Sequence, residues 1–306
     1  MNLKTKIGGV IFKNPIWTAS GTFGAGEEFQ DFLDLDEVGA VVTKTVTLNA
    51  REGNIPPRIV ETSSGLLNSI GLENKGISAF KKEHYPYLKR LKTRIIISIA
   101  GEKKEELKKC AALVSDKNFP HAIELNLSCP NVIHPEAKYS LIAQDAALTE
   151  EIVSIVKKNA QCPIIVKLTP NVTDIAQIAR SAENGGADAV SLVNTYMGLA
   201  VDAEKMKPVL GNRIGGLSGP AIKPLALKAV WDVYGKVKIP IIGIGGIMTG
   251  LDVAEFMLAG ASAVEVGTAN FTNPAIYKTI LKEFKEYLKR KNIKSAKELV
   301  GKLDGV

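Results

Sequence analysis

Ala122-Ile123-Glu124-Leu125-Asn126-Leu127-Ser128-Cys129-Pro130-Asn131 is the stretch that decides the fold of this 306-residue chain. Its first four residues read as a buried strand, and a thiol, a hydroxyl and two carboxamides follow in the next loop. In a parallel α/β barrel such loops surround the active site, because ligands collect at the carboxyl ends of the strands. A cysteine there can act as nucleophile or general base, whereas an isolated Cys-Pro pair is usually a small buried side chain beside a turn.

Seven further apolar runs resemble this strand. The eight predicted strands lie near 16–20, 40–44, 94–100, 122–126, 164–168, 189–193, 241–243 and 263–266. We expect a helix after each one, most clearly over 103–116, 146–159, 172–184, 221–234, 249–259 and 273–290. Continuously apolar strands that alternate with helices predict an α/β fold, the closed parallel (β/α)8 TIM barrel. A doubly wound open sheet is the alternative, since strand order cannot be read from one sequence.

The predicted barrel carries several additions. Residues 3–13 read as a β-hairpin that turns at Gly8-Gly9 and plugs the bottom of the barrel. Long loops follow strands two, four and six; those over 45–76 and 194–219 are too long for simple turns. Because they leave the carboxyl ends of strands, we expect them to carry function. No linker is evident, so residues 1–306 are predicted to form a single domain.

Composition limits the classes of protein. Three cysteines without paired spacing argue against disulfides and for a reducing cytoplasm. The histidines share no ligand spacing, so no metal site is expected. No apolar run approaches the length of a membrane span, and residues 1–6 lack the apolar segment of a signal peptide. The net charge of +7 would permit nucleic acid, but the lysines alternate with acids as on solvated helices.

Polar residues gather where the predicted strands end. Strand one ends at Ser20, strand two at Thr43-Lys44-Thr45, and strand six at Asn194-Thr195. Strand five carries Lys167. A barrel interior is otherwise apolar, so Lys44 and Lys167 need an anion or a polar ligand unless each extends into solvent.

Glycine-rich loops follow strands seven and eight. They contain Gly245-Gly246 and Gly267-Thr268, and residues 215–220 add a third glycine-rich segment. Glycine lets the backbone approach a ligand closely, and barrels frequently bind phosphate with these two loops. The pattern therefore predicts a phosphorylated cofactor.

Together these motifs resemble the class 1 dihydroorotate dehydrogenases, flavin enzymes of pyrimidine synthesis built on a (β/α)8 barrel. The resemblance runs end to end, and its markers are ASGTFG (19–24), TKTVT (43–47), NSIGLEN (68–74), NLSCPN (126–131), VKLTPN (166–171), GGLSGP (215–220) and GTAN (267–270). The first two are most similar to subclass 1B.

The resemblance implies the residues of the site. FMN would be contacted by Ser20, Lys44, Thr45, Ser98, Asn126, Lys167, Val193, Gly219, Gly245, Gly246, Gly267 and Thr268. Dihydroorotate would be held by Lys44, Asn68, Ser69, Ile70, Gly71, Leu72, Asn126, Asn194 and Thr195. Catalysis is expected from Cys129, Lys44 and Lys167. At Ser98 the family commonly has an asparagine, and the shorter hydroxyl leaves a gap for water or a shifted neighbour.

The implied reaction moves a proton from C5 of dihydroorotate to Cys129 and a hydride from C6 to the flavin. Lys167 would stabilise negative charge on the reduced flavin, and Lys44 would bridge flavin and substrate. Subclass 1B also implies a homodimer core in a heterotetramer, whose partner subunit carries FAD and a 2Fe–2S cluster and reduces NAD⁺. With three scattered cysteines and no dinucleotide-binding motif, this chain is not expected to hold those groups itself.

Four alternatives stay open from the sequence. One is a flavin barrel that acts on another dihydropyrimidine. A second is an RNA-acting barrel similar to the dihydrouridine synthases, although no basic RNA-binding module is appended. A third is a stand-alone homodimer of the 1A type that uses fumarate. The fourth, a non-catalytic scaffold, fits the polar strand ends least.

Overall fold

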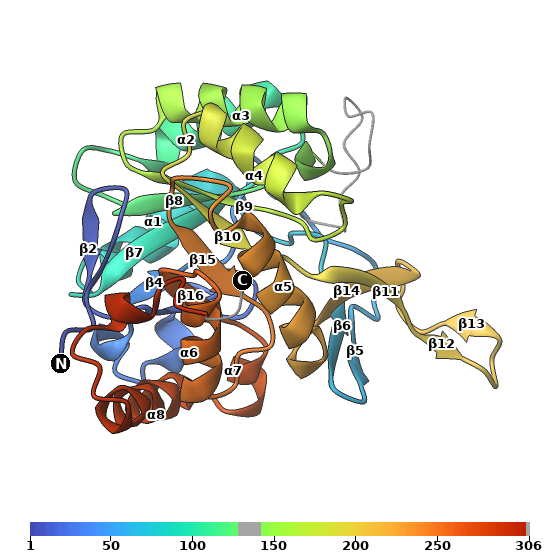
Figure 1. Ribbon diagram of the computed structural model, residues 1–306. Coiled ribbons are helices and arrows are strands. Elements are labelled where there is room, and N and C mark those ends of the chain that lie inside the picture. The colour runs from blue at the N-terminus through green and yellow to red at the C-terminus, as the bar shows by residue number, and fades with distance from the viewer. Residues whose placement is uncertain (128–141, 304–306) are drawn as a thin grey trace.

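The computed structural model describes residues 1–127 and 142–303, and its centre is a closed barrel of eight parallel strands (Figure 1). In chain order these are β3 (Ile16–Thr18), β4 (Ala40–Val42), β7 (Arg94–Ile99), β8 (Ala122–Asn126), β9 (Ile164–Lys167), β10 (Ala189–Leu192), β15 (Ile241–Ile244) and β16 (Ala263–Val266). β16 pairs in parallel with β3, which closes the barrel. The prediction of a TIM barrel is confirmed, and the open sheet is excluded.

Helices cover the outside of the barrel. They are α1 (Gly76–Leu88), α2 (Lys104–Val114), α3 (Ala146–Asn159), α4 (Ile175–Asn184), α5 (Lys223–Val233), α6 (Gly250–Leu258), α7 (Ala269–Thr272) and α8 (Ile276–Arg290). α4 shows why they form: Asp174 caps its first turn, and Ile178, Ala179 and Ala182 make a buried stripe against the barrel. Within the described ranges, no helix is both long and apolar enough to cross a membrane.

One predicted helix is wrong. Between β3 and β4 the chain forms only two short 3₁₀ helices, η1 (Glu27–Phe29) and η2 (Leu35–Glu37). Gly24 and Gly26 have positive φ angles of 54° and 91°, which a continuous α-helix does not allow. Phe23 is fully buried and stacks on Phe29 with 4.2 Å between ring centroids, so aromatic packing anchors this segment instead.

The N-terminal hairpin closes the amino-terminal end of the barrel, as predicted. β1 (Thr5–Ile7) and β2 (Val10–Phe12) pair antiparallel, and the two glycines between them have positive φ angles. Ile7 and Phe12 are buried among residues at the starts of the barrel strands, and the Phe12 ring lies 4.3 Å from that of Trp17. The hairpin thus forms an apolar floor.

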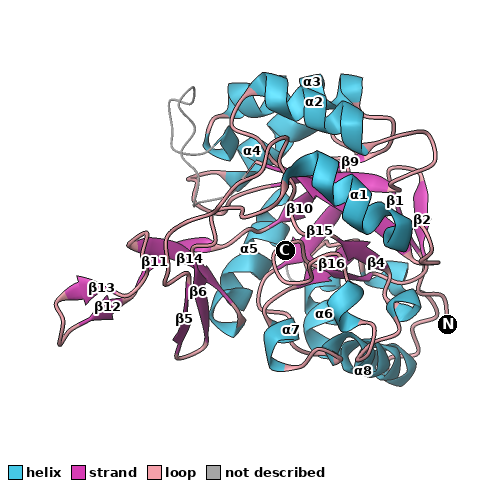
Figure 2. Cartoon of the chain, turned by 180° about the vertical axis from the view of Figure 1, so that it is seen from behind, coloured by secondary structure: helices cyan, strands magenta, loops and turns pink. Residues whose placement is uncertain are grey.

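The long loops after the second and sixth barrel strands pair with each other. β5 (Ile59–Thr62) and β6 (Gly65–Asn68) come from the first loop, and β11 (Tyr196–Leu199) and β14 (Ile214–Ser218) from the second. They form one antiparallel sheet in the order β11-β14-β6-β5, and β12 (Val201–Asp202) with β13 (Lys207–Pro208) extends from it as a protruding arm (Figures 1 and 2). Most of the loop after the fourth barrel strand lies outside the described residues.

Above its floor the barrel interior is polar. The floor residues on the strands are Trp17, Ala40, Val42, Ile96, Ala122, Ile165, Ala189, Ile242 and Ala263. Because every second side chain of a strand faces the same side, the next inward positions include Ser98, Glu124, Ser191 and Glu265. All four are at most 1% exposed. A barrel core of this kind places charged groups directly beneath the carboxyl-terminal mouth.

Candidate active site

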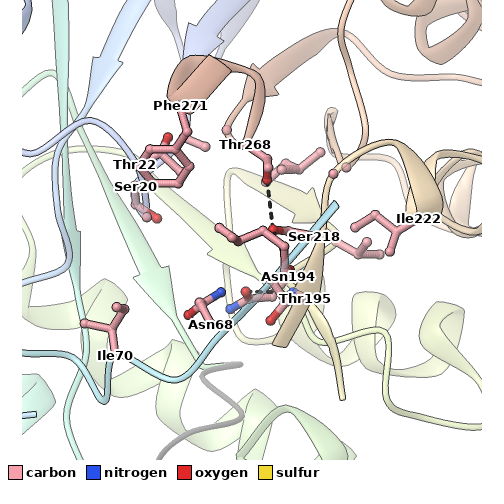
Figure 3. A pocket seen from close by; sticks show the side chains of 18 of the residues that line it. Ser20, Thr22, Asn68, Ile70, Asn194, Thr195, Ser218, Ile222, Thr268 and Phe271 are labelled. Atoms are coloured by element: carbon pink, nitrogen blue, oxygen red, sulfur yellow. Dashed lines mark hydrogen bonds between the residues drawn. The ribbon is translucent and has the colours of Figure 1, made fainter. Parts of the chain in front are cut away.

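A cavity of about 310 Å³ opens at the carboxyl ends of the barrel strands. Its walls combine the strand ends with the sheet made by the two long loops (Figure 3). The volume is within the range of small-molecule and cofactor sites, which in barrels lie at this end.

Most residues predicted for the site line this one cavity. They are Ser20, Lys44, Thr45, Asn68, Ile70, Gly71, Leu72, Asn126, Lys167, Val193, Asn194, Thr195, Gly219, Gly245, Gly246, Gly267 and Thr268. Because they come from strands and loops spread along nearly the whole chain, closure of the barrel is what brings them together.

Three predicted residues have a different place. Ser98 is fully buried beneath Thr45, with 2.9 Å between the two hydroxyls, and is not among the lining residues. Ser69 is also buried behind the wall, where its hydroxyl accepts a hydrogen bond from Asn54 Nδ2 (2.9 Å). Cys129 lies outside the described residues and follows the end of β8 by three positions in the sequence.

Side-chain amides form one end of the cavity. Asn68, Asn194 and Thr195 lie together there, opposite Ser20, Thr22 and Phe271 (Figure 3). Asn194 Nδ2 donates to Asn126 Oδ1 (3.4 Å), and Asn68 Nδ2 donates to the Gly216 carbonyl (3.3 Å). The pairing of β6 with β14 sets this last contact. Amides in this arrangement offer both donors and acceptors to a polar ring.

The two predicted lysines differ in environment. Lys44 is exposed at the cavity, and within the described part of the chain it forms no ion pair. Lys167 is buried, and its Nζ lies 3.6 Å from Glu124 Oε2 and 3.5 Å from Glu265 Oε2. The protein therefore surrounds Lys167 with its own carboxyl groups, whereas Lys44 faces the cavity without one among the described residues.

The electrostatics of Lys167 follow from these neighbours. Burial alone would lower the pKa of Lys167, but the Glu124 and Glu265 carboxyls outweigh burial and raise this pKa above its ordinary value. Burial and the nearby Glu124 raise the pKa of Glu265 well above its usual range. Neither glutamate was predicted as part of the site. Each is a charged residue within an otherwise apolar strand, which is the pattern in the sequence that indicates a buried polar cluster.

The glycines after β15 and β16 differ in what surrounds them. A Cβ on Gly246, where φ is 72°, would lie 2.7 Å from Lys223 Cβ and 3.0 Å from the Gly219 carbonyl oxygen. A Cβ on Gly267 would meet nothing closer than Ala19 Cβ at 3.4 Å. Position 267 faces inward like Glu265, so that Cβ would enter the cavity. Gly267 thus keeps open a space that a bound group can use.

Further lining residues were not predicted. They include Thr22, Ser218, Ile222, Met248 and Phe271. Thr268 Oγ1 donates to Ser218 Oγ (2.8 Å; Figure 3). The Thr22 hydroxyl is buried without a hydrogen-bond partner among the described residues. A buried polar atom of this kind requires a partner, and a bound cofactor can provide it. The cavity fits a cofactor on this ground and through the open space at Gly267.

The other two cysteines are poor candidates for chemistry. Cys110 is buried in α2, and Cys162 is half-buried at the base of β9, at the opposite end of the strand from the cavity. Burial raises the pKa of each thiol to about 12, so neither forms a thiolate readily at neutral pH. Among residues 1–127 and 142–303, no group of His, Cys, Asp and Glu is arranged to hold a metal ion.

Comparison with known proteins decides the family. The sequence profile described as dihydroorotate dehydrogenase matches residues 2–288. The chain belongs to the dihydroorotate dehydrogenase family. This confirms the resemblance seen in the sequence motifs.

Several relatives within the dihydroorotate dehydrogenase family share one name, dihydroorotate dehydrogenase B (NAD(+)), catalytic subunit. The protein from Desulforamulus reducens is 50% identical over 98% of both chains. The protein from Bacteroides thetaiotaomicron is 47% identical over 99% of both chains. That from Geobacter sp. (strain M21) is 48% identical over 99% of this chain and 98% of the relative. Membership of the family implies a flavin cofactor, and the words "catalytic subunit" imply a partner subunit.

Proposed function

We propose that this chain binds FMN and oxidises (S)-dihydroorotate to orotate in the de novo synthesis of pyrimidine nucleotides (UMP). The observation that carries the proposal is the cavity itself: glycine loops, an amide cluster and two lysines face one space in a member of the dihydroorotate dehydrogenase family. FMN, when bound, supplies the redox step by accepting the hydride from C6 of the substrate.

The described residues divide the cavity between cofactor and substrate. The loops with Gly245, Gly246, Gly267 and Thr268 would hold the FMN phosphate, since backbone N–H groups approach a ligand closely there. The ring system would lie against Ser20, Lys44, Thr45, Asn126, Lys167, Val193 and Gly219. Ser98 would reach it only through Thr45, to which it is hydrogen-bonded.

Substrate recognition rests on the amide end of the cavity. A dihydropyrimidine ring carries alternating hydrogen-bond donors and acceptors. Side chains that can pair with both kinds of group are those of Asn68, Asn126, Asn194 and Thr195. Lys44 is the cation available to the substrate carboxylate. The segment 69–72 would close over the ring, and Cys129, in the loop after β8, would take the proton from C5.

A spectrum of the purified protein tests this function. We expect a yellow protein that releases about one FMN per chain on denaturation. Anaerobic dihydroorotate should bleach the flavin absorbance, and dihydrouracil should not. A colourless protein that cannot take up FMN contradicts the proposal. Bleaching by dihydrouracil instead would favour another dihydropyrimidine as substrate.

The role of Cys129 has its own test. Cys129→Ala should retain bound flavin but reduce it with dihydroorotate about 10²–10⁴ times more slowly, because the general base is lost. Cys129→Ser should keep part of the activity, shifted to higher pH, since a hydroxyl is the poorer base. Stopped-flow absorbance measures both. Flavin reduction at the normal rate in Cys129→Ala at neutral pH would exclude this role.

We further propose that electrons leave through a partner subunit that carries FAD and a 2Fe–2S cluster and reduces NAD⁺. The relatives' name supports it, since it joins NAD(+) to a catalytic subunit. A homodimer of this chain would form the core of the resulting heterotetramer. The free thiols of Cys110 and Cys162 fit a reducing compartment, and we place the protein in the cytoplasm.

A further inference from the structure

Three ionisable side chains meet inside the barrel, below the cavity. Glu124 of β8 and Glu265 of β16 flank Lys167 of β9, and the side chains of the two glutamates are 0% and 1% exposed. Lys167 Nζ also donates to Ser20 Oγ at 3.3 Å, and both Lys167 and Ser20 line the cavity. The cluster therefore connects the sealed interior to the ligand site.

Glu124 lies among hydroxyl groups that can donate hydrogen bonds to its two oxygens. Ser98 Oγ donates to Glu124 Oε1 (3.1 Å), and Ser191 Oγ donates to Glu124 Oε2 (3.3 Å). Behind Ser98, Thr45 Oγ1 accepts from Asn126 Nδ2 (3.4 Å) and is hydrogen-bonded to Ser98, so a continuous series of hydrogen bonds connects the cavity with Glu124. Two hydroxyl donors stabilise a carboxylate.

Glu265 has the opposite environment. Within residues 1–127 and 142–303, its Oε1 atom is buried without a hydrogen-bond partner. The charges of Glu124 and Lys167 act on Glu265, and Glu265 in turn adds to burial in raising the pKa of Tyr277 of α8. If both glutamates were ionised, two buried negative charges would face one positive charge. An unbalanced buried charge costs several kcal/mol, and a carboxyl in this position keeps its proton instead.

We propose that Glu124 and Glu265 share one proton at neutral pH and together hold Lys167 as a cation beneath the cavity. They act as positioning residues, because they reach the ligand site through Lys167. The cluster is then neutral, with one cation and one anion. Only its last link rests on the proposed function: the Lys167 charge would lie beside the flavin and favour the reduced, negatively charged cofactor.

Infrared spectroscopy detects the shared proton directly. At pH 7 the purified protein should show the carbonyl stretch of a protonated carboxyl group. Glu265→Gln should abolish this band, and the matched control Glu105→Gln, whose side chain is 72% exposed, should keep it. A wild-type protein without the band, or an unchanged band in Glu265→Gln, would overturn the proposal.

The pH dependence of stability is a second readout. The pKa of Glu265 is raised in the folded protein, so its contribution to stability is complete below the unfolded value of about 4.3 and declines as pH rises through the folded pKa. Glu265→Gln removes this decline. The melting temperature of Glu265→Gln relative to wild type should therefore rise with pH above about 4.3. A difference in melting temperature between Glu265→Gln and wild type that stays constant with pH would contradict the proposal of a shared proton.

A double variant separates proton sharing from simple packing. Either single change, Glu124→Gln or Glu265→Gln, leaves one carboxylate for Lys167, because the remaining glutamate can ionise. The double change leaves none. FMN affinity in the double variant should fall roughly tenfold or more beyond the product of the single effects. A loss of FMN affinity in the double variant that equals the product of the two single losses would contradict the proposal. A protein that binds no FMN at all would contradict the proposed function. The infrared and melting experiments do not depend on FMN, so they would still show whether the two glutamates share a proton.

Discussion

Gly267 and Gly246 lie in the two glycine loops that we propose bind the cofactor, and they differ in what surrounds them. At position 267 the protein leaves room for a side chain, whereas at position 246 φ is 72° and an added Cβ would lie 2.7 Å from Lys223 Cβ. The sequence predicted that both glycines allow close approach to a phosphate. The surroundings show that Gly267 leaves space in the cavity, while the backbone itself also requires glycine at position 246.

Gly267→Ala should weaken FMN binding roughly tenfold or more, because its methyl group takes up space in the cavity. The melting temperature of the cofactor-free protein should hold or rise slightly, since alanine reduces the freedom of the unfolded chain. Gly246→Ala should lower the melting temperature instead. Fluorescence quenching measures the FMN affinity of each variant, and thermal melts of the cofactor-free proteins measure their stability. Normal FMN affinity in Gly267→Ala would place the cofactor elsewhere in the cavity.

The sequence was a good guide to residues that end strands and a poor one to residues inside them. Lys44, Asn126 and Asn194 stand where apolar strands stop, so their place at the mouth follows from the barrel alone. Glu124 and Glu265 are flanked by apolar neighbours and lie one step deeper, where a barrel is normally apolar. Their cluster is visible only once the strand register is known.

At the scale of elements, the N-terminal hairpin should stabilise the barrel without contributing to binding. Phe12 is fully buried in the floor, and Ile11, the neighbouring residue on the same strand, is 53% exposed. Phe12→Ala should lower the free energy of unfolding by about 3–5 kcal/mol, as is typical for a buried phenylalanine. Ile11→Ala is the control and should change it little. Urea denaturation measures both, and equal losses would mean that the hairpin does not pack as a floor.

Arg58 braces the connection that carries residues 68–72, which we propose bind the substrate. Its guanidinium pairs with Glu73 (2.6 Å) and donates to the Glu52 carbonyl (2.8 Å), which ties together the two ends of 52–73. Arg58→Met should raise the KM for dihydroorotate roughly tenfold, because residues 68–72 lose their fixed position. Bound flavin should stay unchanged.

Arg290→Met is the matched control for Arg58→Met. Arg290 ends α8, lies over the Tyr287 ring and does not line the cavity. Steady-state kinetics of the two variants separate a local effect from the loss of any surface arginine. A KM that rises equally in both, or loss of flavin in Arg58→Met, contradicts the bracing role.

Helix periodicity predicted the elements well wherever an apolar stripe and a cap coincide, as in α4. It failed between β3 and β4, where Phe23 and Phe29 pack by stacking and two glycines interrupt the helix. The pairing of β6 with β14 could not be predicted either. Short strands from two separate loops carry no signal of which partner they choose.

At the scale of the whole molecule, residues 1–127 and 142–303 build one barrel with a single set of added hairpin and loop sheets. Within the described residues every strand belongs to the barrel, the floor hairpin or the loop sheets. The isolated chain should therefore pass electrons from dihydroorotate to artificial dyes and reduce NAD⁺ poorly. Adding the partner subunit should restore the reduction of NAD⁺.

Stopped-flow reoxidation of the reduced chain by dye, NAD⁺ and fumarate checks this. Rapid reoxidation by fumarate without a partner would assign the chain to the stand-alone type and leave the dihydroorotate chemistry intact. Rapid reduction of NAD⁺ by the isolated chain would contradict the need for a partner.

The sheet that joins the two long loops also fixes when the cavity can form. Asn68 and Gly216, which pair in it, are 148 positions apart. During synthesis β5 and β6 leave the ribosome long before β14, and contacts so distant in sequence form late in folding. A nascent or prematurely ended chain therefore lacks the wall of the cavity that these two loops build. Under the proposed function, such a chain would not take up dihydroorotate before the barrel is nearly complete.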